Sequence, residues 1–137
     1  MADSNVHKVT DETGEVLAIL TRDMRLLLNG EFVTDDTDEL QVGSFRYNSR
    51  HKVKKHIHNE LPRTISRTQE FLFVQDGTAV VSIYNMTGAL VEALTLTQGS
   101  GLLIFKGWHD LEIHDHCQFF EVKLGPYMGA DDKSYED

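Results

Sequence analysis

Short apolar segments that alternate with turn residues are the feature that most constrains the fold of this chain. From Leu40 onward, runs rich in valine, isoleucine, leucine and phenylalanine are interrupted roughly every 8 to 12 residues by glycine, asparagine, aspartate or proline. Little of this part has the 3.6-residue period of a helix. The pattern is typical of an antiparallel β-sandwich or barrel, so we predict an all-β fold.

The apolar runs and the turn signals together define the expected elements. Asp76-Gly77 is a two-residue hairpin signal between two such runs. Upstream of Leu40, residues 16–20 are expected to form a strand, while periodicity leaves residues 24–28 open between a helical turn and a strand. The strands expected after that point are residues 40–47, 53–58, 70–75, 78–84, 90–96, 102–105, 108–113 and 119–124.

The length of 137 residues fits one domain. We expect residues 1–39 to form an N-terminal extension with a short strand or helix, of which residues 1–12 are disordered or loosely attached. Residues 40–127 then form the barrel, and residues 128–137 form a polar tail. No linker divides the barrel segment.

Composition excludes several classes of protein. A formal net charge of −9 argues against general nucleic-acid binding. No apolar run approaches the ~20 residues that a membrane-spanning helix needs, so no membrane partner is expected. The single cysteine, Cys117, rules out an internal disulfide, and a cytoplasmic location is the default expectation.

The positive charge is concentrated in one segment. One interpretation is a solvated surface with chance clustering. The other is a positive rim that attracts a small anionic substrate. Seven of the thirteen basic residues lie between positions 46 and 67, where Glu60 is the only acid: Arg46, Arg50, Lys52, Lys54, Lys55, Arg63 and Arg67.

His56 and His58, inside this basic segment, indicate a metal site. On a strand, residues i and i+2 face the same side, so one strand can direct both imidazoles to one point. Glu70 and His109, from other strands, could complete the site, with apolar residues of matching parity below them. Three imidazoles and one carboxylate suit one divalent ion such as iron, manganese, nickel or zinc. The alternative is a pair of surface histidines.

These residues resemble the two motifs of the cupin superfamily. His56-x-His58, Glu70 with six residues to Gly77, and Lys106-Gly107-Trp108-His109 match the histidine pair, the glutamate and the final histidine. The resemblance implies a small antiparallel β-barrel of jelly-roll type (a double-stranded β-helix) that holds one metal. Eleven residues separate His58 from Glu70, where the family usually has three or four; without Glu70 a three-histidine site remains.

The C-terminal part of the chain is similar to one group of cupins. Phe120-Glu121-Val122-Lys123-Leu124-Gly125-Pro126-Tyr127, followed by Asp132-Lys133, resembles the tail of WbuC-type cupin metalloproteins. Those proteins are associated with surface-polysaccharide biosynthesis. The resemblance implies a role in that metabolism.

Three functions remain open from the sequence. The first is a metal-dependent enzyme of isomerase or oxygenase type acting on a small anionic molecule, such as a sugar derivative, with Tyr47 or Lys54 as proton-transfer residues. The second is a binding module that holds a sugar, another small molecule or a structural metal without turnover. The third is an interaction protein that has lost its metal. A homodimer is expected, because edge strands in small barrels often pair across subunits.

Overall fold

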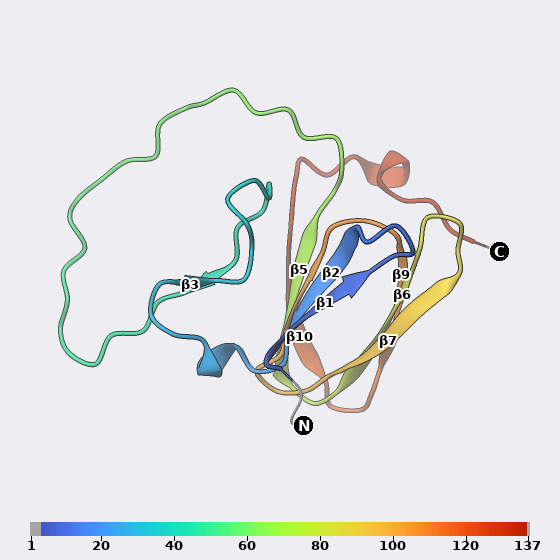
Figure 1. Cartoon of the computed structure of the whole chain (residues 1–137), viewed down its shortest axis with the longest axis horizontal. Coiled ribbons are helices and arrows are strands. Elements are labelled where there is room, and N and C mark those ends of the chain that lie inside the picture. The colour runs from blue at the N-terminus through green and yellow to red at the C-terminus, as the bar shows by residue number, and fades with distance from the viewer. Residues whose placement is uncertain (1–3, 137) are drawn as a thin grey trace.

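The structure, a computed structural model, describes residues 4–136 and is all-β with antiparallel sheets (Figure 1). Within these residues the only helical elements are two 3-10 turns, η1 (Met24–Leu26) and η2 (Gly129–Asp132). The prediction of an all-β antiparallel fold is confirmed. Two sheets face each other as in a sandwich, and the described strands do not close into a barrel.

The larger sheet has five strands in the order β1-β2-β8-β5-β10. The central strand β8 pairs on one side with β2 and on the other with β5, so segments from both halves of the chain meet there. The strands are β1 (Val6–Thr10), β2 (Val16–Thr21), β5 (Glu70–Asp76), β8 (Gly101–Ile104) and β10 (Gln118–Lys123).

The smaller sheet has three strands in the order β7-β6-β9. A turn forms at Asp76-Gly77 as expected, but the hairpin prediction is wrong, because β5 and β6 lie in different sheets and do not pair with each other. The turn carries the chain from the larger sheet to the smaller one, and Gly77 has a φ of +82°, which glycine adopts without a steric penalty. A separate two-stranded ribbon covers the larger sheet. The strands are β6 (Ala79–Tyr84), β7 (Leu90–Leu96) and β9 (Trp108–Ile113), and the ribbon is β3 (Glu31–Phe32) with β4 (Gly43–Ser44).

The main core lies between the two sheets, because alternate residues of each strand point inward. In β6 the inward set Ala79, Val81 and Ile83 is buried, while the residues between them are partly exposed. Burial of each aliphatic side chain contributes roughly 1.5–3 kcal/mol, so this cluster is the main source of stability. The buried members are Val9, Leu17, Ala18, Leu20, Leu72, Val74, Val81, Ile83, Leu94, Leu96, Leu102 and Ile104.

A second apolar cluster lies on the outer face of the larger sheet, where residues 24–44 cover it. Ile19, Leu103 and Phe105 point outward from the sheet and pack with Val42 of the covering segment. This segment includes η1 and the β3–β4 ribbon. Much of the outer face of the sheet is therefore covered by this segment.

The N-terminal segment belongs to the sheet. Residues 6–21, which we assigned to an extension, form β1 and β2, and His7 of β1 lies 2.8 Å from Glu92 of β7. The expectation of loose attachment is wrong for Val6–Thr10; residues 1–3 lie outside the described residues. The sequence pattern missed β1 because only two of its residues, Val6 and Val9, are aliphatic.

Most of the other predicted strands are confirmed within one or two residues, but two are wrong. The strand expected at 40–47 is reduced to Gly43–Ser44, and the one expected at 53–58 is absent. In the segment from Arg50 to His58 only Val53 and Ile57 are apolar, so a strand there has no continuous face to bury in a single chain.

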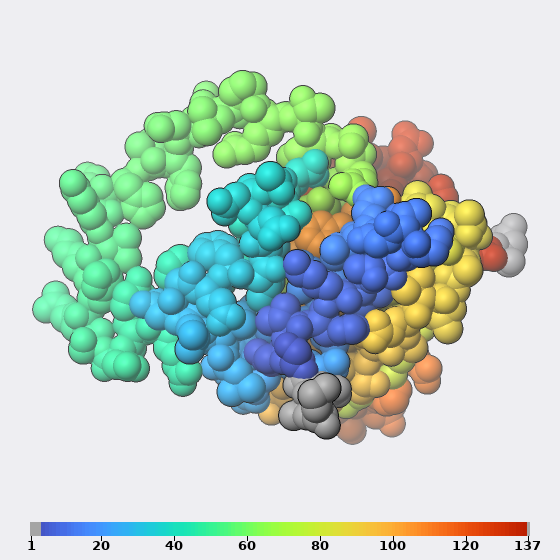
Figure 2. Space-filling view, in the orientation of Figure 1, coloured from blue at the N-terminus to red at the C-terminus, as the bar shows by residue number. Residues whose placement is uncertain are grey.

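We call residues 45–68 the arm. All of them are exposed and none belongs to a helix or strand. The arm leaves the body after β4 and returns at β5 as a wide extended loop (Figure 1). In the space-filling view a gap separates most of the arm from the rest of the chain (Figure 2).

No helix in residues 4–136 is long and apolar enough to cross a membrane.

Candidate functional site

Glu70 and His109 meet on the inner side of the fold. Glu70 begins β5 of the larger sheet, and His109 is the second residue of β9 in the smaller sheet. The Nε2 atom of His109 lies 2.8 Å from Oε1 of Glu70, and the Glu70 side chain is only 12% exposed. Two residues that the sequence placed in one site are therefore brought together.

The strand registers explain why both side chains point to the interior. Glu70 lies opposite Ile104 of β8, and His109 lies opposite Ile83 of β6. Ile104 and Ile83 are buried in the main core. Because directly paired residues share a face, the acid and the imidazole sit on an apolar base between the sheets. The predicted arrangement, a polar group at one end of an apolar interior, is present for this pair.

Two residues of β10 extend this polar group, and the sequence interpretation missed both. Lys123 lies opposite Glu70, and Glu121 lies opposite Leu72, so both share the face of Glu70. Glu121 is close enough to Glu70 for the two carboxyl groups to influence each other's pKa. The alternation Phe119, Glu121, Lys123 contained the signal, because Phe119 packs on the core and the other two have the same parity.

The charges of the two carboxyl groups differ because of their neighbours. The hydrogen bond from His109 lowers the pKa of Glu70 from 4.5 to about 2, against the opposing effect of burial. The Glu70 carboxylate in turn raises the pKa of Glu121, which keeps its proton longer in order to donate a hydrogen bond to Glu70. The site therefore combines one firmly ionised carboxylate, one imidazole and one carboxyl group that retains its proton more readily.

His56 and His58 lie on the arm and are exposed. Their ring centroids are 5.4 Å apart, and Nδ1 of His56 lies 2.9 Å from the carbonyl oxygen of Lys54. They are not on a strand, so the geometric basis of the same-face argument is absent in the single chain. Tyr47 and Lys54, the expected proton-transfer residues, are also exposed on the arm, where the centroid of the Tyr47 ring lies 4.6 Å from that of the stacked His51 ring.

A single chain therefore does not bring enough metal-binding side chains together to complete a metal site. Among residues 4–136, no group of three or more histidine, cysteine, aspartate or glutamate side chains is arranged to hold a metal ion. Glu70 and His109 are suitable donors for a borderline divalent ion. A metal at this point needs further ligands, and His56 and His58 have the chemistry to supply them only if the arm docks on the pair.

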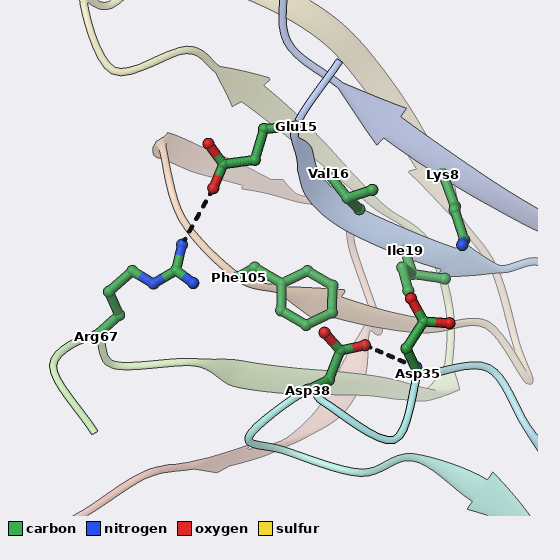
Figure 3. Close-up of a pocket in the computed structure, with 8 residues that line it drawn as sticks. All are labelled: Lys8, Glu15, Val16, Ile19, Asp35, Asp38, Arg67 and Phe105. Carbon is green, nitrogen blue, oxygen red and sulfur yellow. Dashed lines mark hydrogen bonds and ion pairs between the residues drawn. The ribbon is translucent and has the colours of Figure 1, made fainter. Parts of the chain in front are cut away.

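A separate cavity of about 170 Å³ lies on the outer face of the larger sheet (Figure 3). The guanidinium of Arg67 lies 3.6 Å from the carboxylate of Glu15, which also pairs with Lys106. The carboxylate of Asp38 accepts a hydrogen bond from the backbone N–H of Asp35. The carboxylates of Glu15 and Asp38 already have partners within the chain, and the cavity lies on the opposite face of the sheet from Glu70.

Comparison of the chain with protein-family models, with curated proteins and with solved structures gives no match. What the protein does must therefore be inferred from its own residues.

Proposed function

We propose that this chain is a cupin-type protein that binds one divalent metal ion, iron, manganese, nickel or zinc, and acts on a small anionic molecule such as a sugar derivative. Glu70 and His109 form the fixed half of the site, and His56 and His58 form the half carried by the arm. The observation that carries the proposal is the 2.8 Å approach of His109 to Glu70, which joins the two motifs across two sheets.

The surroundings of the pair support binding of a small polar ligand. Its base is apolar, and Glu121 and Lys123 stand beside it on the same face. A small number of convergent polar groups above an apolar base is the usual composition of a ligand site. Lys123 can attract an anionic group, since its ammonium lies 3.8 Å from the carboxylate of Asp132, too far for a strong hydrogen bond.

The roles of the residues follow from their chemistry. A bound divalent metal would act as a Lewis acid on a carbonyl or enolate oxygen, or would activate oxygen if the ion is iron. Glu70 supplies an ionised carboxylate at neutral pH. The basic residues of the arm draw the anion toward the site, and Tyr47 or Lys54 transfers the proton once the arm is docked.

A binding role without turnover is the second candidate. It is favoured by the position of His109, 2.8 Å from the Glu70 carboxylate, which gives the carboxylate a partner without a metal. The two candidates differ in whether a divalent ion binds, and in whether that ion keeps a coordination position at which water can be exchanged for substrate.

Metal binding tests the proposal directly. We expect the purified full chain, stripped with chelator and titrated with Co²⁺, to bind one ion per chain. His109→Ala, Glu70→Ala and His56→Ala should each weaken the affinity by about tenfold to a hundredfold or more. His114→Ala is the matched control, because His114 follows the same strand, is half exposed and has only Glu112 within 4 Å as a charged partner.

Unchanged Co²⁺ affinity in both His56→Ala and His109→Ala would overturn the metal site. Loss of binding in the His114 variant would instead indicate a different set of ligands.

A further inference from the structure

The arm has the properties of a segment that is docked on another molecule. Its ends are anchored: the backbone N–H of Arg46 donates to Asn29, and the buried Gln69 accepts a hydrogen bond from the backbone N–H of Leu40. Between these ends, no backbone group of residues 47–68 pairs with another backbone group of residues 4–136. A protein segment without such bonds relies on water or on a partner for them.

The arm also exposes large apolar side chains. A solvated polar loop has no need for them, and each would gain roughly 1.5–3 kcal/mol by burial. All of them are at odd-numbered positions, so in an extended arm they form one apolar strip on the face opposite to that of His56 and His58. They are Phe45 (65% exposed), Val53 (59%), Ile57 (84%), Leu61 (60%) and Ile65 (44%).

The charge of the arm is opposite to that of the rest of the chain. The arm holds seven of the thirteen basic residues and one of the twenty-two acids, so its formal charge is +6 and that of the remaining residues is −15, with histidines counted as neutral. Near its end, Arg63 already lines one hollow with the acidic loop residues Asp36, Asp38 and Glu39. A second copy of this chain therefore offers an acidic surface that complements the arm.

The site region has unpartnered edges that could receive the arm. Within the described residues β9, which carries His109, pairs only with β6, and β10 pairs only with β5. On the outward face of β10, Phe120 and Val122 are more than half exposed. A free strand edge is a surface on which an extended segment can add as a further strand, and the edge of β9 is the one that carries His109.

We propose that two copies of this chain exchange arms, so that the arm of one copy lies along β9 of the other and brings His56 and His58 to the Glu70–His109 pair there. The arm leads away from its own body (Figures 1 and 2), and a loop of this length extends at most about 40 Å from its anchored ends, which is sufficient to reach a neighbouring copy. This inference rests on the proposed metal site and adds that each site is built from two copies.

Complementation between two defective chains tests the exchange. One chain carries His56→Ala and His58→Ala, and the other carries Glu70→Ala and His109→Ala. The two are co-expressed with different tags, and the mixed dimer is isolated by two affinity steps. If arms are exchanged, one of its two sites has all four ligands, because the intact arm of the second chain reaches the intact pair of the first.

The expected result is that the mixed dimer binds Co²⁺ with wild-type affinity and half the wild-type capacity. Each defective homodimer should bind at least about tenfold more weakly. If His56 and His58 instead fold back onto the pair of their own chain, neither site of the mixed dimer is complete. A mixed dimer that binds as weakly as the homodimers, while the wild type binds normally, would overturn the exchange.

A second measurement does not depend on metal. Ile57→Asp places a charge at an arm position that is 84% exposed in the single chain, so it should leave the fold intact but disrupt a docked arm. Light scattering should show a dimer for the wild type and a mass shifted to the monomer for Ile57→Asp. Met86→Asp is the control, since Met86 is 61% exposed and lies in the β6–β7 turn, outside the arm.

The two measurements separate the two proposals. A wild-type dimer that binds no Co²⁺ but is dissociated by Ile57→Asp removes the metal site and supports the docked arm. A monomeric wild type, or a dimer that Ile57→Asp leaves as intact as Met86→Asp does, overturns the exchange whatever the metal content.

Discussion

The imidazole Nε2 atom of His109 on β9 lies 2.8 Å from the carboxylate of Glu70 on β5, and this contact connects the two sheets at one end of the interior. The Glu70 side chain is only 12% exposed, and Glu121 is a second neighbour that affects its pKa. This contact determines the charge of the candidate site and the way in which its stability depends on pH.

The first prediction concerns acid. The folded pKa of Glu70, about 2, lies below the 4.5 of an ordinary glutamate, so its stabilising effect is complete above pH 4.5 and is lost as the pH falls toward 2. Between pH 5 and pH 2 the unfolding free energy of Glu70→Gln should therefore decrease by about 1–2 kcal/mol less than that of the wild type, after allowance for solvent screening. Urea unfolding with chelator present, at a series of pH values, measures this.

Glu112→Gln is the matched control for that series, because Glu112 lies on the same strand as His109 with 80% of its side chain exposed. An identical acid profile for wild type and Glu70→Gln would show that the contact with His109 does not hold the carboxylate ionised.

The second prediction has the opposite sign. The folded pKa of Glu121 is raised by the Glu70 carboxylate, so the stability linked to its proton is present at low pH and is lost as the pH rises from 4.5 through that folded pKa. Glu121→Gln keeps a hydrogen-bond donor without the charge. It should raise the unfolding free energy at pH 7 by roughly a few tenths of a kcal/mol, since Glu121 is exposed. A decrease at pH 7, measured as a lower Tm, contradicts this account.

The third prediction concerns the turn that positions His109. Gly107 has a φ of +94°, and a Cβ atom there would collide with the carbonyl oxygen of Tyr84. Gly107→Ala should lower the unfolding free energy by about 2–4 kcal/mol. Gly14→Ala is the control for backbone strain alone, because Gly14 has a φ of +86° and open space around it. Equal losses in the two variants, measured by urea unfolding, would mean that the contact with Tyr84 is not restrictive.

The sequence was a good guide wherever a strand has one buried face. The segments around Leu72, Val81, Leu94 and Leu102 have the period-2 or continuous apolar pattern of buried strands, and each forms a strand close to the predicted bounds. The Glu70–His109 contact was also predictable, because both residues have the parity of inward-facing apolar neighbours.

The sequence was a poor guide where strands pair without an alternation of apolar and polar residues. The edge strand Val6–Thr10 has three polar residues and only two aliphatic ones, so its sequence resembles a loop. Residues 53–58 have a histidine spacing that suits a strand, but Val53 and Ile57 have no core of their own chain to cover. Whether such a segment becomes a strand depends on the surface against which it can pair. Sequence periodicity carries no information about that surface.

The last prediction follows from arm docking and uses trypsin. The arm contains an exposed run of basic residues at Arg50, Lys52, Lys54 and Lys55, so a free arm offers several cleavage sites close together. Docking would hide them, and cleavage would then follow the population of undocked chains. We expect the wild type at high concentration to be cut in this run at least about tenfold more slowly than Ile57→Asp, with the difference shrinking as the wild type is diluted below its dimer dissociation constant. Met86→Asp should behave as the wild type does; equal cleavage rates for wild type and Ile57→Asp at every concentration would show that the arm is free in both.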